Sequence, residues 1–208
     1  MGVLVRFIAA AFLSANLSAC ASVGEDSTAS LPGMEYSQAA PPLRGPGSPE
    51  KPPSGFVAFC ARNIADCRAP SDAPETVTLT EDTWAKLEEV NLTVNQAIQP
   101  LDDSVHYGTV EYWTVPSDGY GDCDDYVLAK RKMLMLLGIP EPALRIAVVL
   151  TRSRVRHAVL TVVTDRGDYV LDNRRSEILP RSKTDYTWVE RQDPASSTGW
   201  ISLRLAVN

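Results

Sequence analysis

Residues 121–137 read GDCDDYVLAKRKMLMLL, and this stretch decides the fold. Three acids surround Cys123 at its start, where carboxylates suit the N-terminal end of a helix. Apolar side chains then recur at helical spacing and form one stripe, made of Tyr126, Val127, Met133, Leu134 and Leu137. Gly138 and Pro140 follow, as is typical of a helix end. The stretch therefore predicts a helix over residues 122–137 that begins at a cysteine.

The segments on either side of this helix predict an α+β domain. Upstream, Thr80 can cap a helix whose apolar positions run at helical spacing from Trp84 to Ile98, and Pro100 stops it. Downstream the pattern changes to that of strands, with runs at 144–151, 156–164, 169–172, 187–190 and 201–207. Helices followed by an antiparallel meander are typical of the α+β class, so we expect helices packed on an antiparallel sheet.

Three residues that can carry chemistry fall at the ends of these predicted elements. Cys123 starts the helix, where backbone N–H groups and the helix dipole favour a thiolate and lower the pKa of the thiol. His157 opens the second strand, and Asp172 lies on the third. Taken singly, each could be an ordinary core or turn residue. Together they predict a Cys-His-Asp arrangement for nucleophilic catalysis.

The predicted pairing of the strands constrains this triad. With Arg166-Gly167 as a two-residue turn, His157 and Asp172 lie on one face of the sheet, but His157 pairs with Ser176. The resulting four-residue offset is about 13 Å along a strand, which is too far for a hydrogen bond. The triad therefore requires a bulge or a strong bend between the two strands.

The motif around the cysteine resembles the bacterial transglutaminase-like cysteine proteinases. The resemblance is carried by Gly121-Asp-Cys-Asp-Asp-Tyr126 with Lys130 and Pro140 behind it, by Arg156-His-Ala-Val159, by Leu171-Asp-Asn173 and by Phe59-Cys-Ala-Arg-Asn63 through Cys67. It implies a papain/transglutaminase-like cysteine peptidase fold over residues 56–208. It also implies that Cys123 is the nucleophile, that His157 is the general base and that Asp172 orients the histidine.

The best-known members of that family are LapG-type periplasmic proteases. These enzymes need calcium, clip a surface adhesin and are held in check by an inner-membrane receptor of cyclic di-GMP. The resemblance therefore implies cleavage of a peptide bond in a protein substrate of the surface-exposed or adhesin type, and a regulatory receptor as a further partner. Two alternatives remain open: a transglutaminase-like enzyme that transfers the acyl group to an amine, and a non-catalytic binding module on this scaffold.

Acids crowd the predicted nucleophile. Asp122, Asp124 and Asp125 flank Cys123, and their charge opposes formation of the thiolate. A hard cation bound by some of them would remove this conflict, and calcium takes oxygen ligands. The resemblance implies that Asp122 and Asp125 hold calcium. The alternative is that these acids merely suit the start of a helix.

The first twenty residues, MGVLVRFIAAAFLSANLSAC, predict a secretory signal peptide. The apolar run behind Arg6 is too short to cross a membrane as a helix. The last four residues, Leu17-Ser-Ala-Cys20, resemble a bacterial lipobox, which implies acylation of Cys20; a signal that is simply cleaved is the alternative. By analogy with lipoprotein sorting, Ala21 favours the outer membrane. We therefore expect a periplasm-facing protein whose lipid anchor is its only membrane contact.

Composition predicts the boundary between anchor and fold. Residues 21–55 hold no hydrophobic periodicity, and seven of the fifteen prolines lie between Pro32 and Pro53. Such a segment is typical of an extended, flexible tether. The remaining residues, 56–208, are long enough to bury one sizeable core and form the predicted peptidase domain.

The four cysteines divide between these parts. Cys60 and Cys67 lie seven residues apart in a compartment that permits disulfides, and we expect them to pair; two buried thiols are the alternative. With Cys20 acylated, Cys123 remains a lone thiol, for which nucleophilic catalysis is the leading reason.

Charge argues against several other functions. The chain has 20 basic and 26 acidic residues, a net charge of −6, and no basic cluster. This balance disfavours binding to nucleic acid or to anionic membrane surfaces. With only two histidines and no pair of cysteines at the spacing of zinc ligands, the sequence also argues against a zinc site.

Overall fold

The computed structural model describes residues 47–68 and 72–204. Its α-helices are α1 (Ser54–Arg62), α2 (Glu81–Ala97), α3 (Asp103–His106) and α4 (Cys123–Leu136), with short 3₁₀ helices at Ile64–Cys67, Glu141–Ala143 and Arg181–Lys183. Its strands are β1 (Pro49–Glu50), β2 (Gln99–Pro100), β3 (Tyr120–Gly121), β4 (Leu144–Leu150), β5 (Arg156–Thr164), β6 (Gly167–Leu171), β7 (Leu179–Pro180), β8 (Thr187–Gln192) and β9 (Trp200–Ser202). The predicted signal, the lipobox and most of the predicted tether lie outside the described residues.

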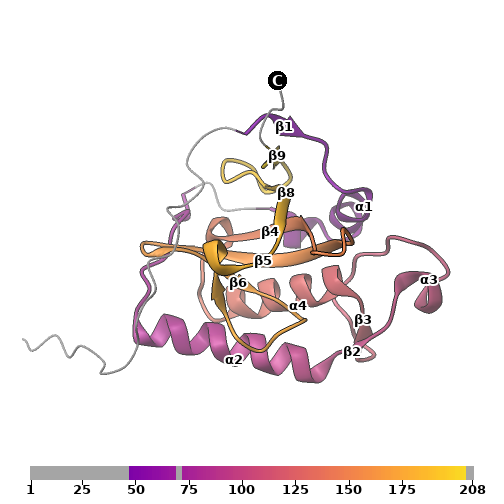
Figure 1. Ribbon diagram of the computed structural model, residues 1–208, viewed down its shortest axis with the longest axis horizontal. Helices are drawn as coiled ribbons and strands as arrows, with labels where there is room; N and C mark the ends of the chain where they lie inside the picture. The colour runs from indigo at the N-terminus through magenta and orange to yellow at the C-terminus, as the bar shows by residue number, and fades with distance from the viewer. Residues whose placement is uncertain (1–46, 69–71, 205–208) are drawn as a thin grey trace, which may run out of the picture. The chain divides into compact units, whose positions relative to one another are not determined.

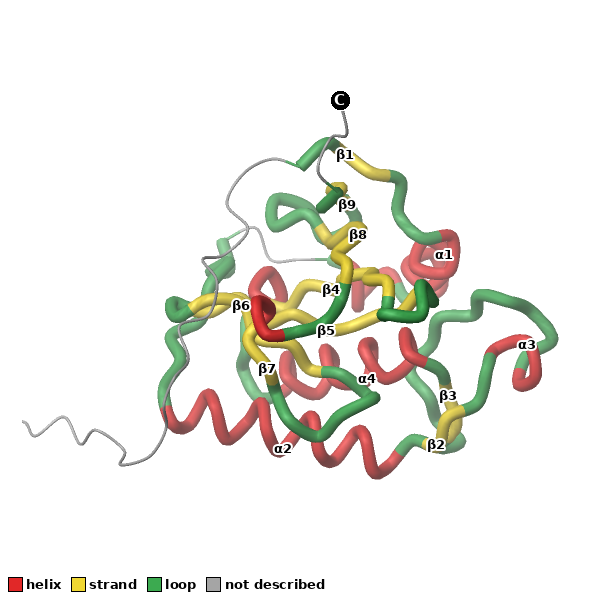
Figure 2. The backbone as a smooth tube through the Cα atoms, viewed as in Figure 1, coloured by secondary structure: helices red, strands yellow, loops and turns green. Residues whose placement is uncertain are grey.

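The centre of the fold is a seven-stranded sheet in the order β1-β9-β8-β4-β5-β6-β7, with every neighbouring pair antiparallel. Helix α4 packs against β5, and α2 packs against α4 on the side away from the sheet (Figure 1). The largest apolar core fills the space between the sheet and these helices. The expected α+β class, with helices on an antiparallel sheet, is confirmed (Figure 2).

Helix α4 begins where the sequence predicts, because its first turn caps itself. The side chains of Asp122 and Asp125 form a capping box, in which each accepts a hydrogen bond from the backbone of the other. Leu134 is fully buried, as expected, but Leu137 is the C-cap residue and remains 37% exposed. The prediction that Leu137 lines the core was therefore wrong, because the helix ends before its side chain can turn inward.

Helix α2 runs antiparallel to α4 and supports it (Figure 1). Thr80 caps α2 by accepting a hydrogen bond from the backbone N–H of Thr83, and Leu87, Val90 and Val94 form its buried stripe. At the C-terminal end of α2, the Tyr126 hydroxyl of α4 donates to the Ile98 carbonyl at 2.5 Å. This bond fixes how far one helix is shifted along the other.

The turn between β5 and β6 lies one residue earlier than the sequence analysis predicts. Thr164 pairs with Gly167, so the two turn residues are Asp165 and Arg166. Asp165 is held by a distant segment: its backbone N–H donates to the Val77 carbonyl, and its carboxylate accepts from the Leu79 N–H. This tertiary anchor, which no local pattern reveals, sets the register of the two strands.

The domain contains several elements that the sequence analysis does not predict. The β1 strand pairs with β9, and α1 begins at Ser54, so the folded chain reaches back to residue 47, into the segment assigned to the tether. The stretch at 101–121, to which the sequence analysis assigns no element, holds α3 and β3. The last predicted strand, 201–207, is observed as Trp200–Ser202, and its residues 205–207 lie outside the described part of the chain.

The predicted disulfide is present. Cys60 and Cys67 are bonded, and the bridge joins α1 to the 3₁₀ helix that follows it. Cys123 is the free cysteine of the described residues and is half-buried. Within residues 47–68 and 72–204, no helix has the length and apolar character needed to span a bilayer.

Candidate active site

Cys123 and His157 line one cleft, which has a volume of about 370 Å³. It is lined by the start of α4, the start of β5, the loop after β6 and residues that precede α1 and β3. Trp113 closes one side and is held in place by close packing against Gly55, where an added Cβ would lie 2.2 Å from the indole ring. The structure thus brings the predicted nucleophile and general base to a common solvent-connected space.

The Cys123 thiol sits over the backbone of β5. Its Sγ accepts a hydrogen bond from the Ala158 N–H at 3.4 Å. In the part of the chain that the structure describes, no hydrogen bond joins this thiol to the His157 ring. Burial, followed by the charge of Asp124, raises the pKa of the Cys123 thiol above its ordinary value, and the hydrogen bond from Ala158 offsets only part of this. The expectation of a lowered pKa at the helix start is wrong for this state, because burial and the neighbouring acids outweigh the helix dipole.

His157 and Asp172 form a buried hydrogen-bonded pair. The distance from His157 Nε2 to Asp172 Oδ1 is 2.8 Å. The corrected register makes this contact attainable: Asp172 follows the last residue of β6 and is offset from His157 by two residues, or about 7 Å along the strand, instead of four. No bulge between β5 and β6 is needed. The bond leaves the ring Nδ1 as the nitrogen that can exchange a proton in the cleft.

Two further groups donate hydrogen bonds to the Asp172 carboxylate. The Arg174 N–H donates to Oδ1 at 3.0 Å, and the Tyr186 hydroxyl donates to Oδ2. Burial by itself raises the pKa of Asp172. The hydrogen bonds from these two groups and from His157 outweigh burial and lower this pKa to about 2. Sequence reasoning missed Tyr186, because it reaches Asp172 from the segment before β8 and belongs to no local motif.

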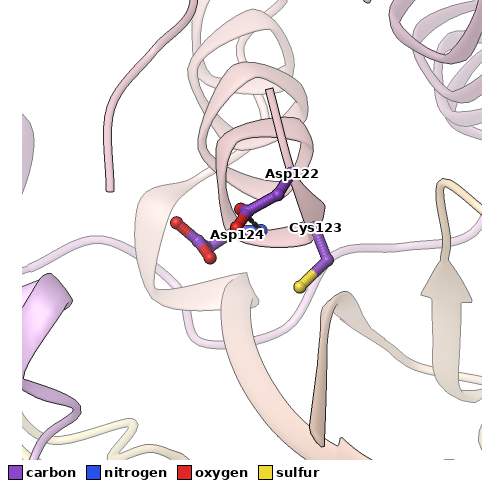
Figure 3. Close-up of side chains that lie close together, drawn as sticks. All are labelled: Asp122, Cys123 and Asp124. Carbon is purple, nitrogen blue, oxygen red and sulfur yellow. Dashed lines mark hydrogen bonds between the residues drawn. The ribbon is translucent and has the colours of Figure 1, made fainter. Parts of the chain in front are cut away.

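Acidic side chains gather at the start of α4 in two overlapping groups. Figure 3 shows Asp122, Cys123 and Asp124 together at the first turn. The second group joins Asp122 and Asp125 to Asp103 of α3, with one carboxylate oxygen from each within 4.8 Å of the others. The sequence analysis singled out Asp122 and Asp125. It missed Asp103, nineteen residues upstream, because nothing local links α3 to α4.

The second group has the character of a cation site. Burial and the charges of neighbouring acids raise the pKa of Asp103, although a backbone hydrogen bond offsets part of this. The same causes raise the pKa of Asp125 to about 7. Asp103 Oδ1 is buried without a hydrogen-bond partner, whereas Oδ2 accepts from the Tyr112 N–H. Buried carboxylates that face one another must share protons or bind a cation. The oxygen donors present fit a hard divalent ion such as calcium.

Comparison with known proteins gives one family and a set of solved structures. The family model for the bacterial transglutaminase-like cysteine proteinases (BTLCP) matches residues 47–207. Solved structures of LapG from Legionella pneumophila, one of them calcium-bound, are 28% identical with a TM-score of 0.47 and cover 53% of this chain. The EGTA-treated form gives the same identity, coverage of this chain and score. The matched region spans 65% of the calcium-bound LapG chain, and no curated protein sequence matches.

Proposed function

Because the chain belongs to the bacterial transglutaminase-like cysteine proteinases, we propose that it hydrolyses peptide bonds through Cys123, His157 and Asp172. The observation that carries this proposal is the shared cleft: the thiol and the imidazole line it together, and the imidazole is bonded from behind to a buried carboxylate. That order of groups is the one required for nucleophilic catalysis by a cysteine.

The chemistry follows from these positions. His157 Nδ1 takes the proton of the Cys123 thiol, and Sγ attacks the carbonyl carbon of the substrate amide. We propose that the backbone N–H of Cys123, the first residue of α4, donates to the oxyanion that forms. The imidazolium then gives its proton to the leaving amine, which breaks the C–N bond. Water, deprotonated by His157, releases the acid product and restores the thiol. Asp172 keeps the ring oriented throughout.

A thiol-directed electrophile tests this assignment. We expect a peptide vinyl sulfone to alkylate Cys123 and neither Cys60 nor Cys67, because these two cysteines are joined in a disulfide. Turnover of a peptide library in H₂¹⁸O with an added primary amine then separates the reactions: hydrolysis places ¹⁸O in the new carboxyl group, whereas acyl transfer gives an amide. A binding module would neither label at Cys123 nor turn over the library.

We infer that Asp103, Asp122 and Asp125 hold calcium. The buried, unpartnered Oδ1 of Asp103 supports this inference, as does the position of the group beside the nucleophile. Bound calcium would supply positive charge that offsets the acids near the thiol. Asp125 also caps α4 and accepts a hydrogen bond from the Thr114 N–H at 2.8 Å. Calcium binding by the three acids and order at the start of α4 are therefore linked.

Chelation is therefore expected to lower thermal stability and activity together. If calcium is present at 100 times its Kd, its removal costs about 2.7 kcal/mol, or a fall in Tm of about 5–10 °C. Asp103→Asn should reproduce the fall in calcium buffer and should abolish the response to EGTA in differential scanning fluorimetry. Asp82→Asn, which removes an exposed acid of α2, is the matched control and should keep the response. An unchanged Tm in excess EGTA would contradict calcium binding.

We further propose the location and the partners of the enzyme. Residues 1–20 act as a signal with a lipobox, Cys20 carries the lipid, and the segment up to residue 46 leads from an outer-membrane anchor into a periplasm-facing domain that begins at residue 47. These N-terminal features rest on the sequence pattern alone. The family supports a protein substrate. An adhesin-type surface protein as that substrate, and an inner-membrane receptor as regulator, rest on the resemblance to LapG-type proteases.

A further inference from the structure

The chain between β2 and β3 leaves the body of the fold and returns to it. The two strands pair in parallel, with Gln99 opposite Tyr120, so they close the base of this excursion, and α3 lies within it, away from the central sheet (Figure 1). Long connections in compact domains often carry binding functions. Residues 100–102 of this part of the chain, together with Glu111 and Trp113, line the active-site cleft. The excursion therefore continues the surface of the cleft outward.

Four rings from this part of the chain form a continuous row, which we call the aromatic row. The Tyr112 and Tyr107 rings lie 4.5 Å apart, and Tyr107 stacks on His106 at 3.9 Å. The edge of Tyr120 meets His106 at 6.2 Å. At the other end, the Arg62 guanidinium of α1 lies over the Tyr112 ring, 4.4 Å from its centre. Aromatic rings in such a row offer apolar faces together with polar edges.

Contacts with the rest of the fold hold the aromatic row in place. The Arg62 guanidinium, besides stacking on Tyr112, donates to the Trp113 carbonyl at 2.9 Å. The Tyr112 N–H donates to the buried carboxylate of Asp103. A surface that is already ordered loses little conformational entropy when a partner binds. The aromatic row is therefore a preformed platform.

The aromatic row and its flanks face solvent. Val105 is 72% exposed and Val110 is 80% exposed, while Tyr107 and Tyr120 are exposed by 37% and 41%. Within the described part of the chain, the hydroxyl groups of Tyr107, Tyr112 and Tyr120 make no hydrogen bond. Exposed tyrosines grouped with aliphatic side chains are typical of surfaces that bind another polypeptide.

The charge beside the aromatic row is negative. From β2 to β3 the chain carries four acidic residues and no lysine or arginine. Asp102 and Glu111 are exposed and line the cleft, and Asp118 is exposed while it holds His106 at 2.8 Å. The cation of the row, Arg62, is engaged at the far end. A polypeptide that combines apolar and basic side chains matches this surface best.

We propose that the aromatic row, with Val105 and Val110, is an exosite for the substrate. It holds an extended, apolar stretch that carries lysine or arginine, while the adjoining part of the same polypeptide occupies the cleft. This inference rests on the proposed peptidase function. Continuity favours the substrate over a separate partner, because a chain that leaves the cleft past Asp102 or Glu111 runs directly onto the row. Rows of aromatic side chains suit extended, proline-containing segments, which lose little entropy on binding.

The test measures peptide binding to the Cys123→Ala protein, so that no turnover intervenes. The probe is a fluorescent peptide of Val, Pro and Lys; one comparison peptide has Glu for Lys, and another has Gly and Ser for Val and Pro. In fluorescence anisotropy at low salt, the probe should bind at least about tenfold more tightly than either comparison peptide. Its advantage over the Glu peptide should shrink in about 0.5 M salt, and its advantage over the Gly/Ser peptide should persist.

A variant with Val105→Ser and Val110→Ser together removes the apolar flank and leaves the residues that line the cleft unchanged. In the Cys123→Ala background it should weaken probe binding by about five- to tenfold. Leu136→Ser is the matched control, because Leu136 is 82% exposed at the end of α4, outside the aromatic row. The control should bind as the parent does. Unchanged binding by the double variant, an equal loss in Leu136→Ser, or a preference for the Glu peptide would overturn the proposal.

Two further measurements separate the other outcomes. In the active protein, joining the probe sequence to one end or the other of a cleaved peptide should lower KM with kcat unchanged, and the double variant should lose this gain. A dimer in sedimentation velocity that the double variant abolishes would assign the row to a second copy and overturn the substrate proposal. Because probe binding needs no turnover, a lack of peptidase activity counts against the proposed function alone.

Discussion

Cys123→Ala is expected to lower peptidase activity by at least about 10⁴-fold, because the variant cannot form the covalent intermediate on which the proposed reaction depends. Its effect on stability should be small. The thiol is half-buried, and its one hydrogen bond is a long one, from the Ala158 N–H at 3.4 Å. Tm should therefore change by no more than about 2 °C. Activity is measured as new termini in a peptide library, and Tm by scanning fluorimetry.

Cys123→Ser provides the shape-matched comparison. Its hydroxyl can accept the same backbone bond, yet it is a far weaker nucleophile at neutral pH, so it should also lose several orders of magnitude in rate. Retention of more than a tenth of the wild-type rate by Cys123→Ala would exclude the cysteine mechanism and return the chain to the class of binding modules or of enzymes with another nucleophile.

Asp172→Asn is expected to reduce kcat by about 10²–10⁴-fold, since an amide at this position no longer stabilises the imidazolium or fixes its tautomer. It should also change the stability of the fold in acid. The pKa of Asp172 is about 2, below its ordinary value of 3.8, so its ionised form stabilises the folded state by about 2 kcal/mol. That contribution is fully present above about pH 4 and is lost as the pH falls through 2. In Asp172→Asn, Tm should be lower above pH 4 and should fall less between pH 4 and 2.

Thr80→Ala is a suitable control for this experiment. The Thr80 side chain caps α2 by accepting a hydrogen bond from the Thr83 N–H, outside the residues that line the cleft. The control should lose stability and keep its kcat. Equal kcat values for Asp172→Asn and the wild type would show that the His157–Asp172 bond is structural only.

Local patterns in the sequence carry much of the fold. The helical stripe from Trp84 to Ile98, the start of α4 at Cys123 and the strand at 156–164 were all predicted from spacing and caps, and the structure has them. The predicted register of β5 and β6 was wrong, because Asp165 is held by residues 77–79. This contact joins segments that lie far apart in the sequence. Periodicity describes which face of a strand is buried; it does not say which tertiary contact decides a turn.

The candidate site divides in the same way. Cys123, His157 and Asp172 could be singled out because each stands at the end of a predicted element. Asp103 and Tyr186 could not, because they approach the site from segments whose own patterns carry no signal. The thiol shows a second limit: the sequence reveals that Cys123 begins a helix, but the degree of burial, which here dominates its pKa, exists only in the folded chain.

The two outer strands of the central sheet limit how copies of this chain can associate. Each has only two residues, and each contains a proline: Pro49 in β1 and Pro180 in β7. Because proline has no N–H to donate, an incoming strand finds at most one backbone donor at either margin of the described sheet. Long, flat margins of antiparallel sheets are the usual templates for domain swapping and fibre growth. These short proline-bearing margins disfavour both.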